Sequence, residues 1–241
     1  MLDNSISQTD SKYFDFKTKK ENDGFYIYHH VGWSGLTIIK FDIKKGKNLD
    51  GSFIDSLYPD LYKKEKIFVN TKGSLDIKSL EYQFSLEKFD AVDLISGSQG
   101  YQITCLEDST VFIISSNNLT NYNEKPIFFN FKKDIETKDL WGGQCISRPY
   151  EGKGLTLVLF DLKEGFKFED KGHSNEQITW VINGSVDFYA NDNRQTLTSD
   201  NGLDIGPNHK HGGVSAGAIG FDAFFPKRNE IKYKKITWQK I

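Results

Sequence analysis

Short runs of apolar residues, many of them β-branched or aromatic, recur along the whole chain between Gly, Asn and Asp. Examples are GLTIIKFDI (35–43) and GLTLVLFDL (154–162). Runs of this length and composition, bounded by turn residues, are typical of β-strands. The pattern therefore predicts an all-β protein. Only two short stretches favour helix, Ser56–Lys64 and Lys133–Leu140.

The chain also contains an internal repeat. Gly35–Gly46 and Gly154–Gly165 are identical at seven of twelve positions. Further along, EKIFVNTKGSLDI (65–77) resembles EQITWVINGSVDF (176–188), and LEKFDAVDL (86–94) resembles LTSDNGLDI (197–205). A repeat this long is not a solenoid unit and predicts a duplicated domain. The expected organisation is an N-terminal extension (1–23), a first barrel (24–117), a linker (118–140) and a second barrel (141–241).

Each copy carries the same turn signals. A strand is predicted to end at Gly46 or Gly165, and the next strand runs into a Gly-Ser turn. In the second copy this turn is Asn183-Gly184, a strong hairpin signal because both residues tolerate positive φ. A further reversal is expected at Asn191–Arg194.

Composition limits the functional class. The 241 residues are 37% hydrophobic and 27% charged, with a net charge of −2 spread along the chain. Nothing resembles a basic stripe for nucleic acid or the roughly 20 apolar residues of a membrane span. Two distant cysteines, Cys105 and Cys145, and a polar N-terminus without a leader predict a reducing, cytoplasmic setting.

Residues able to bind metal gather in the second copy. They follow the spacing Gly165, Lys171, His173, Gln177, Gly184, then Gly202, Pro207, His211, and finally FDAFFPKR (221–228). This spacing resembles the two motifs and the closing segment of the cupins, and with the repeat the chain resembles a bicupin. The second copy is similar to the bicupin isomerase of bacilysin biosynthesis and to cupins that linearise uronates. The resemblance implies two tandem cupin barrels (double-stranded β-helix, or jelly roll), paired as a homodimer.

The resemblance also implies a divalent transition metal (Fe, Mn, Ni, Co or Zn) on His173, Gln177 and His211. Lys171 stands where the family has its first His, and an ammonium has no lone pair to offer a metal. Two alternatives remain open. Burial could deprotonate Lys171, or His209 could supply a third imidazole.

Alternation along a strand predicts that Lys171, His173 and Gln177 share the barrel interior. Glu176 should then face outward or towards the other copy. Read without the motif, His173 and Gln177 would be hydrogen-bonded core groups and His209 a solvated loop residue. In the first copy Lys66 and Gly100 occupy the positions of Gln177 and His211, so no metal site is predicted there.

The expected function is conversion of a small polar or anionic metabolite, such as a sugar-acid carbonyl compound, by isomerase or lyase chemistry. Lys171 would be an anion anchor or general base, and His211 a metal ligand essential for turnover. The alternative is a metal-free bicupin that binds a small molecule or serves a structural role without catalysis. No nucleic-acid or membrane partner is expected.

Overall fold

The computed structural model describes residues 11–16, 20–22, 24–61, 64–79, 81–94, 101–119 and 125–228. Strands dominate these residues, which confirms the all-β prediction. The α-helix among them is α1 (Gly51–Leu57), which begins five residues before the predicted Ser56–Lys64, and a short 3-10 helix (Pro59–Leu61) lies within that predicted range. The predicted helix at Lys133–Leu140 is wrong, because turns lead there into strand β13 (Lys138–Leu140). No helix in the described ranges is long and apolar enough to cross a membrane.

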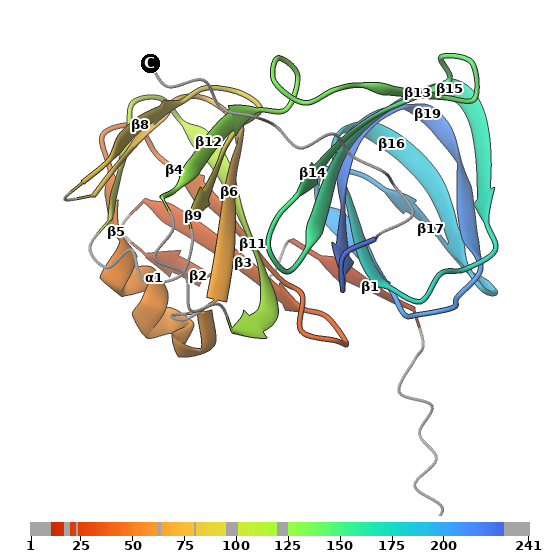
Figure 1. Ribbon diagram of the computed structural model, residues 1–241, viewed down its shortest axis with the longest axis horizontal. Coiled ribbons are helices and arrows are strands. Elements are labelled where there is room, and N and C mark those ends of the chain that lie inside the picture. Colours follow the sequence, from red (N-terminus) through yellow and green to blue (C-terminus); the bar gives the residue numbers. More distant parts are fainter. Residues whose placement is uncertain are drawn as a thin grey trace, which may run out of the picture.

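Two sheets build the first half of the molecule (left in Figure 1). The seven-stranded sheet has the order β12 (Ile127–Asn130), β9 (Asp90–Leu94), β6 (Lys64–Lys72), β11 (Ser109–Leu119), β4 (Thr37–Ile43), β3 (Phe25–Val31) and β2 (Lys20–Asn22). The four-stranded sheet has the order β5 (Asn48–Asp50), β10 (Gln102–Cys105), β7 (Leu75–Lys78) and β8 (Gln83–Leu86).

One curled sheet builds the second half (right in Figure 1). Its order is β1 (Lys12–Asp15), β18 (Asn201–Ile205), β16 (Glu176–Ala190), β19 (His211–Phe225), β15 (Thr156–Asp170), β14 (Cys145–Glu151) and β13, with β17 (Asn193–Leu197) also paired to β16. Two of these strands come from outside the predicted second barrel, since β1 belongs to the predicted extension and β13 to the predicted linker.

Asn183-Gly184 does not form the predicted hairpin turn. Both residues lie inside β16, where the pairing with β19 shifts register on either side of them. Gly165 likewise lies within β15 rather than at its end. These irregularities bend the long strands so that one sheet curls around its own core. The predicted reversal at Asn191–Arg194 is confirmed, because β16 ends at Ala190 and β17 begins at Asn193.

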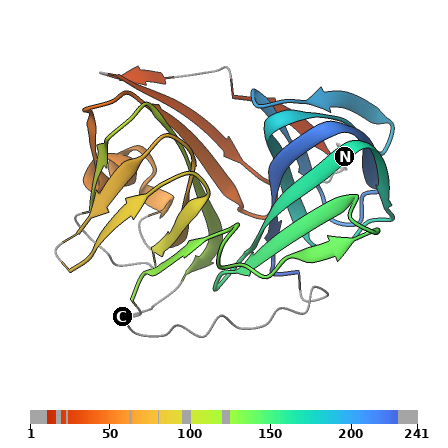
Figure 2. The ribbon, with the colours of Figure 1, turned by 90° about the horizontal axis from the view of Figure 1, so that it is seen from above.

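Three apolar clusters hold the molecule together. One fills the interior of the first half, including Phe41, Phe68 and Ile113. A second fills the curled sheet, including Phe160 and Phe188. The third lies between the halves and takes residues from both, so the two halves, side by side in Figure 2, form one folded unit.

Buried acidic groups border the contact between the halves. Asp93 on β9 is 1% exposed and accepts a hydrogen bond from the Tyr150 hydroxyl at 2.8 Å. Burial, and next the nearby Glu65 carboxyl, raise the pKa of Asp93 well above its ordinary value. The folded protein therefore holds a proton at Asp93 over a pH range in which the unfolded chain releases it.

This proton makes stability depend on pH. Because the folded-state pKa of Asp93 lies above the unfolded value of about 3.9, its stabilisation is full below that value and is lost as pH rises through the folded pKa. We expect Asp93→Asn, which cannot ionise, to reduce the loss of unfolding free energy on going from pH 5 to pH 9. A single proton can change the free energy of unfolding by at most about 1.4 kcal/mol per pH unit. Urea unfolding at several pH values measures this slope. Asp187→Asn, at an exposed position, is the control, and an equal change in both variants would contradict the assignment.

Candidate metal centre

Asp170, His173 and His211 form a compact group, with one possible ligand atom from each lying within 4.8 Å of the others. Asp170 ends β15 and His211 begins β19, and these two residues are direct partners across the antiparallel pair. His173 lies in the loop that leads from β15 to β16. Both imidazoles are buried.

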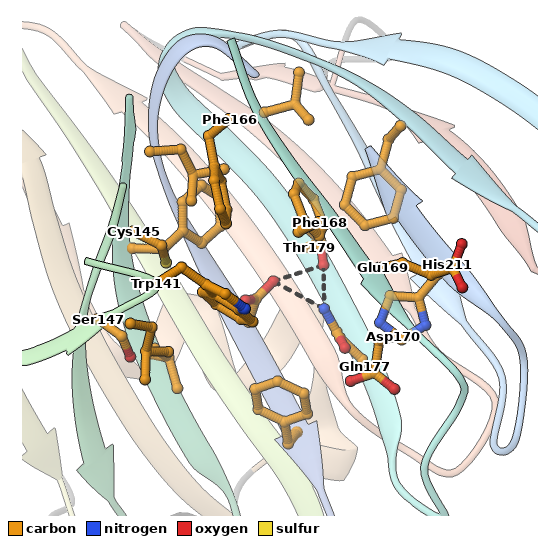
Figure 3. A pocket seen from close by; sticks show the side chains of 18 of the residues that line it. Trp141, Cys145, Ser147, Phe166, Phe168, Glu169, Asp170, Gln177, Thr179 and His211 are labelled. Atoms are coloured by element: carbon orange, nitrogen blue, oxygen red, sulfur yellow. Dashed lines mark hydrogen bonds between the residues drawn. The ribbon is translucent and has the colours of Figure 1, made fainter. Parts of the chain in front are cut away.

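Gln177 adds an oriented amide oxygen to this group. Its Oε1 lies 2.9 Å from Nε2 of His173. The amide nitrogen donates to the Thr179 hydroxyl at 2.8 Å and to Asp222 at 3.0 Å, and Thr179 donates to the same Asp222 oxygen. Since two acceptors hold the NH₂ group, the carbonyl oxygen points towards His173. In Figure 3, Gln177 lies on the same side of the cavity as Asp170 and His211.

The tautomer of His211 follows from its partner. Nδ1 lies 2.9 Å from the main-chain carbonyl of His209, which can only accept, so Nδ1 carries the proton and Nε2 the lone pair. Burial is the largest cause that lowers the pKa of both His211 and His173. Both rings are therefore neutral near pH 7, the state in which imidazole binds a metal.

Asp170 is held by hydrogen bonds on both oxygens. The Gly172 amide donates to Oδ1 at 2.9 Å, and Arg228 donates to Oδ2 at 3.0 Å. Burial alone would raise the pKa of Asp170, but these two bonds together with the nearby positive charge of Arg228 hold the pKa below its ordinary value. Asp170 is therefore a carboxylate at neutral pH.

Asp222 is the other carboxyl of the site. It lies on β19 and lines the cavity of the site, and burial raises its pKa to about 6 in spite of the hydrogen bonds from Thr179 and Gln177. A carboxyl group with a pKa near neutrality can both accept and return a proton at physiological pH.

These polar groups close one end of a cavity of about 190 Å³. Asp170, Gln177 and His211 gather on one side, and Trp141 and Cys145 lie opposite (Figure 3). The remaining walls are mostly apolar, with Val158, Phe160, Leu162, Phe166, Phe168, Val186, Phe188 and Phe224. At the mouth, Trp141 is 63% exposed and its ring lies 5.4 Å from that of Phe166.

The prediction that Lys171 points into the barrel is wrong. Its side chain is exposed and does not line the cavity. Strand β15 ends at Asp170, and Gly172 has a φ of +102°, so the alternation assumed for residues 171–177 does not hold. Asp170, one residue earlier, occupies the inward position instead, and Lys171 is not a candidate for catalysis.

His209 does not bring its imidazole to the group. Its Nδ1 lies 2.9 Å from the hydroxyl of Ser11, just before β1, and only its main-chain carbonyl reaches His211. Four participants were missed by the sequence analysis: Asp170, Thr179, Asp222 and Arg228. The signal for two of them was the closing segment FDAFFPKR, which contains Asp222 and Arg228.

The donor set suits a divalent transition metal. Two neutral imidazoles and a carboxylate, with an amide oxygen beside them, are ligands that Fe, Mn, Co, Ni and Zn accept. His173, His211, Asp170 and Gln177 would hold the ion. Arg228, Thr179 and Asp222 would orient these ligands from outside, as hydrogen-bond partners of metal ligands commonly do.

No protein-family model matches the chain, and no curated protein matches its sequence. Solved structures do match its fold. AerE from Microcystis aeruginosa has a TM-score of 0.68 at 10% identity, over 91% of this chain and 99% of that one. A cupin 2 conserved barrel domain protein from Leptotrichia buccalis has 0.60 at 11%, over 90% and 96%.

A third match is the oxalate decarboxylase of Lactobacillus farciminis in a formate complex. Its TM-score is 0.67 at 9% identity, over 89% of this chain and 86% of that one. The neighbours thus include proteins named as cupins and as oxalate decarboxylases. The chain therefore has the cupin fold.

The Arg228 charge should be visible in the titration of the site histidines. Burial and then Arg228 lower the pKa of His173, and Arg228 also contributes for His211. In chelator-treated Arg228→Gln we expect both ring pKa values to rise, because a nearby positive charge disfavours the imidazolium. NMR titration of the ring protons measures this shift. Arg194→Gln, at an exposed residue, should leave both values unchanged, and a fall in either would contradict this electrostatic picture.

Proposed function

We propose that the protein is a bicupin whose second half binds a divalent metal and converts a small carbonyl compound by isomerase or lyase chemistry. The observation that carries this proposal is the Asp170, His173 and His211 group, of which Asp170 and His211 line the polar end of the cavity. The comparisons support it at the level of the fold, which hosts many chemistries.

The duplication is supported by matching strand registers. Ile67 pairs with Asp93 between β6 and β9, and Ile178 pairs with Asp204 between β16 and β18. These are equivalent positions of the sequence repeat. Each half also has its own internal apolar cluster. The two halves are therefore proposed to be tandem cupin barrels.

The cavity favours a substrate with an apolar body and one oxygen-rich head. Its walls are mainly aromatic rings, which offer few partners to the hydroxyls of a sugar acid. An apolar cavity of roughly 150 Å³ is enough for benzene, so 190 Å³ leaves room for a body of about that size. The head would lie beside Asp170, Gln177 and His211.

The roles of the residues follow from these positions. A bound metal would polarise the substrate oxygen as a Lewis acid. Asp222 would accept and return a proton beside the reacting carbon, because its pKa is about 6. Arg228 has a buried Nε without a partner and would steer an anionic head. The apolar walls would keep water from the reacting atoms.

The alternative is metal-free binding of a small molecule. One observation favours it. The guanidinium of Arg228 forms an ion pair with the Asp170 carboxylate, so the negative charge of Asp170 is balanced without a metal cation. In that case a ligand would bind equally well before and after treatment with a chelator.

Metal binding tests the proposal directly. We expect about one equivalent of Fe, Mn, Co, Ni or Zn, with affinity lowered more than about 100-fold in His211→Ala and Asp170→Asn, since outer-shell changes alone cost about 10–100-fold. Metal titration with elemental analysis of untagged protein measures both. His29→Ala and Lys171→Ala, at exposed positions, are the matched controls. Absence of stoichiometric metal in the wild type would favour the alternative.

Ligand class can be tested without knowing the substrate. We expect phenylacetate, an anion with an apolar body, to raise the melting temperature, and galacturonate to have little effect. A ligand present at 100 times its Kd stabilises by about 2.7 kcal/mol. Thermal unfolding with each compound measures the shift, and Arg228→Gln should reduce it. A larger shift with galacturonate would contradict the apolar-body argument.

A further inference from the structure

Glu176, the first residue of β16, joins the second half to the first. Its Oε2 accepts the main-chain amide of Ser34 at 3.0 Å and approaches that of Leu36 at 3.5 Å. Both amides belong to the turn between β3 and β4. The approach is so close that a Cβ at Gly32 would lie 2.0 Å from Oε1 of Glu176. We call this contact the Glu176 clasp.

The repeat supplies a second, equivalent clasp. Glu65, near the start of β6, accepts the amides of Lys153 and Gly154 from the turn between β14 and β15. Here too a glycine permits the approach, since a Cβ at Gly152 would lie 2.3 Å from Oε1 of Glu65. Each half thus holds a turn of the other half with a glutamate that is 1% exposed or less.

The residues next to the two glutamates are different. Gln177 follows Glu176 and points to the opposite face of β16, where its oxygen meets His173. Lys66 follows Glu65, and its Nζ lies 3.6 Å from Asp55 on α1. Only the Glu176 clasp therefore holds a strand end that carries a residue of the metal centre.

The loop with His173 ends at the same point. Asn175, directly before Glu176, donates to the main-chain carbonyls of Pro226 and Lys227 at 2.6 and 3.2 Å. Two contacts therefore hold the end of this loop and the start of β16. Asn175 bonds the segment that precedes Arg228, and Glu176 bonds the turn of the first half.

We propose that Glu176 is a positioning residue, through which the first half sets the geometry of Gln177 and His173 in the metal centre. This inference rests on the proposed metal-binding function. It gives the first half a role in the site, although none of the described side chains of that half lines the cavity. Glu176 itself does not line the cavity.

The matched variants are Glu176→Ala and Glu65→Ala, which remove equivalent clasps. Glu176→Gln keeps an acceptor oxygen and should rescue the first. We expect both alanine variants to lower the melting temperature, but only Glu176→Ala to weaken Co²⁺ binding. The expected loss is about 10-fold, the lower end of the loss caused by removing a direct hydrogen-bond partner of a metal ligand. Its Co²⁺ absorption spectrum should also change, whereas that of Glu65→Ala should match the wild type.

Equal losses of Co²⁺ affinity in both alanine variants would overturn the inference, as would an unchanged affinity and spectrum in Glu176→Ala. If the wild type binds no metal, the proposed function fails and the inference is judged by NMR of the metal-free protein. The ring signals of His173 should then move in Glu176→Ala and stay in Glu65→Ala, and the opposite pattern would overturn it. Where Glu176→Ala does not fold, Glu176→Asp, which shortens the reach by one methylene, replaces it in the same comparison.

Discussion

The contact between the two halves is the constraint on which the rest of the structure depends. Strand β6 is buried on both faces from Glu65 to Thr71, and strand β16 from Glu176 to Val181, so these parts of the two sheets must be covered from outside as well as from inside. The cover of each is the other half. Trp180 shows this most clearly, because its ring lies 5.5 Å from Phe112 of the first half and 5.5 Å from Phe221 of the second. Separating the halves would expose a complete apolar layer.

The contact between the halves also buries polar groups at its border, and these groups need hydrogen-bond partners within the protein. The turns that protrude from each half present main-chain amides to the other, and buried amides need acceptors. Glu65 and Glu176 supply these acceptors. Asp93 and Asp204 lie beside them and take hydrogen bonds from Tyr150 and from His30 at 2.8 and 3.1 Å. The two glutamates that satisfy these amides lie at or next to the first residues of β6 and β16.

Local patterns in the sequence were sufficient for the all-β class, for the repeat, and for His173, Gln177 and His211 as members of the polar group. They were insufficient where distant segments meet. Alternation placed Lys171 inside, but alternation assumes a continuous strand, and β15 ends at Asp170. His209 was a candidate ligand because it lies two residues before His211. Nothing near it in the sequence indicates that its ring instead meets the hydroxyl of Ser11. Asn183-Gly184 marks an irregularity in the strand rather than a hairpin turn, because β16 pairs with β19 on both sides of these two residues.

The comparison of the two halves separates what the backbone determines from what the side chains determine. Thr179 pairs with Asp222 across β16 and β19, and Phe68 pairs with Ile113 across the equivalent strands β6 and β11. In the first half these positions join the apolar core. In the second half they carry the hydroxyl and the carboxyl that orient Gln177. Equivalent strand pairings therefore support either a packed interior or a polar site, and exchanges at a few inward positions account for the difference.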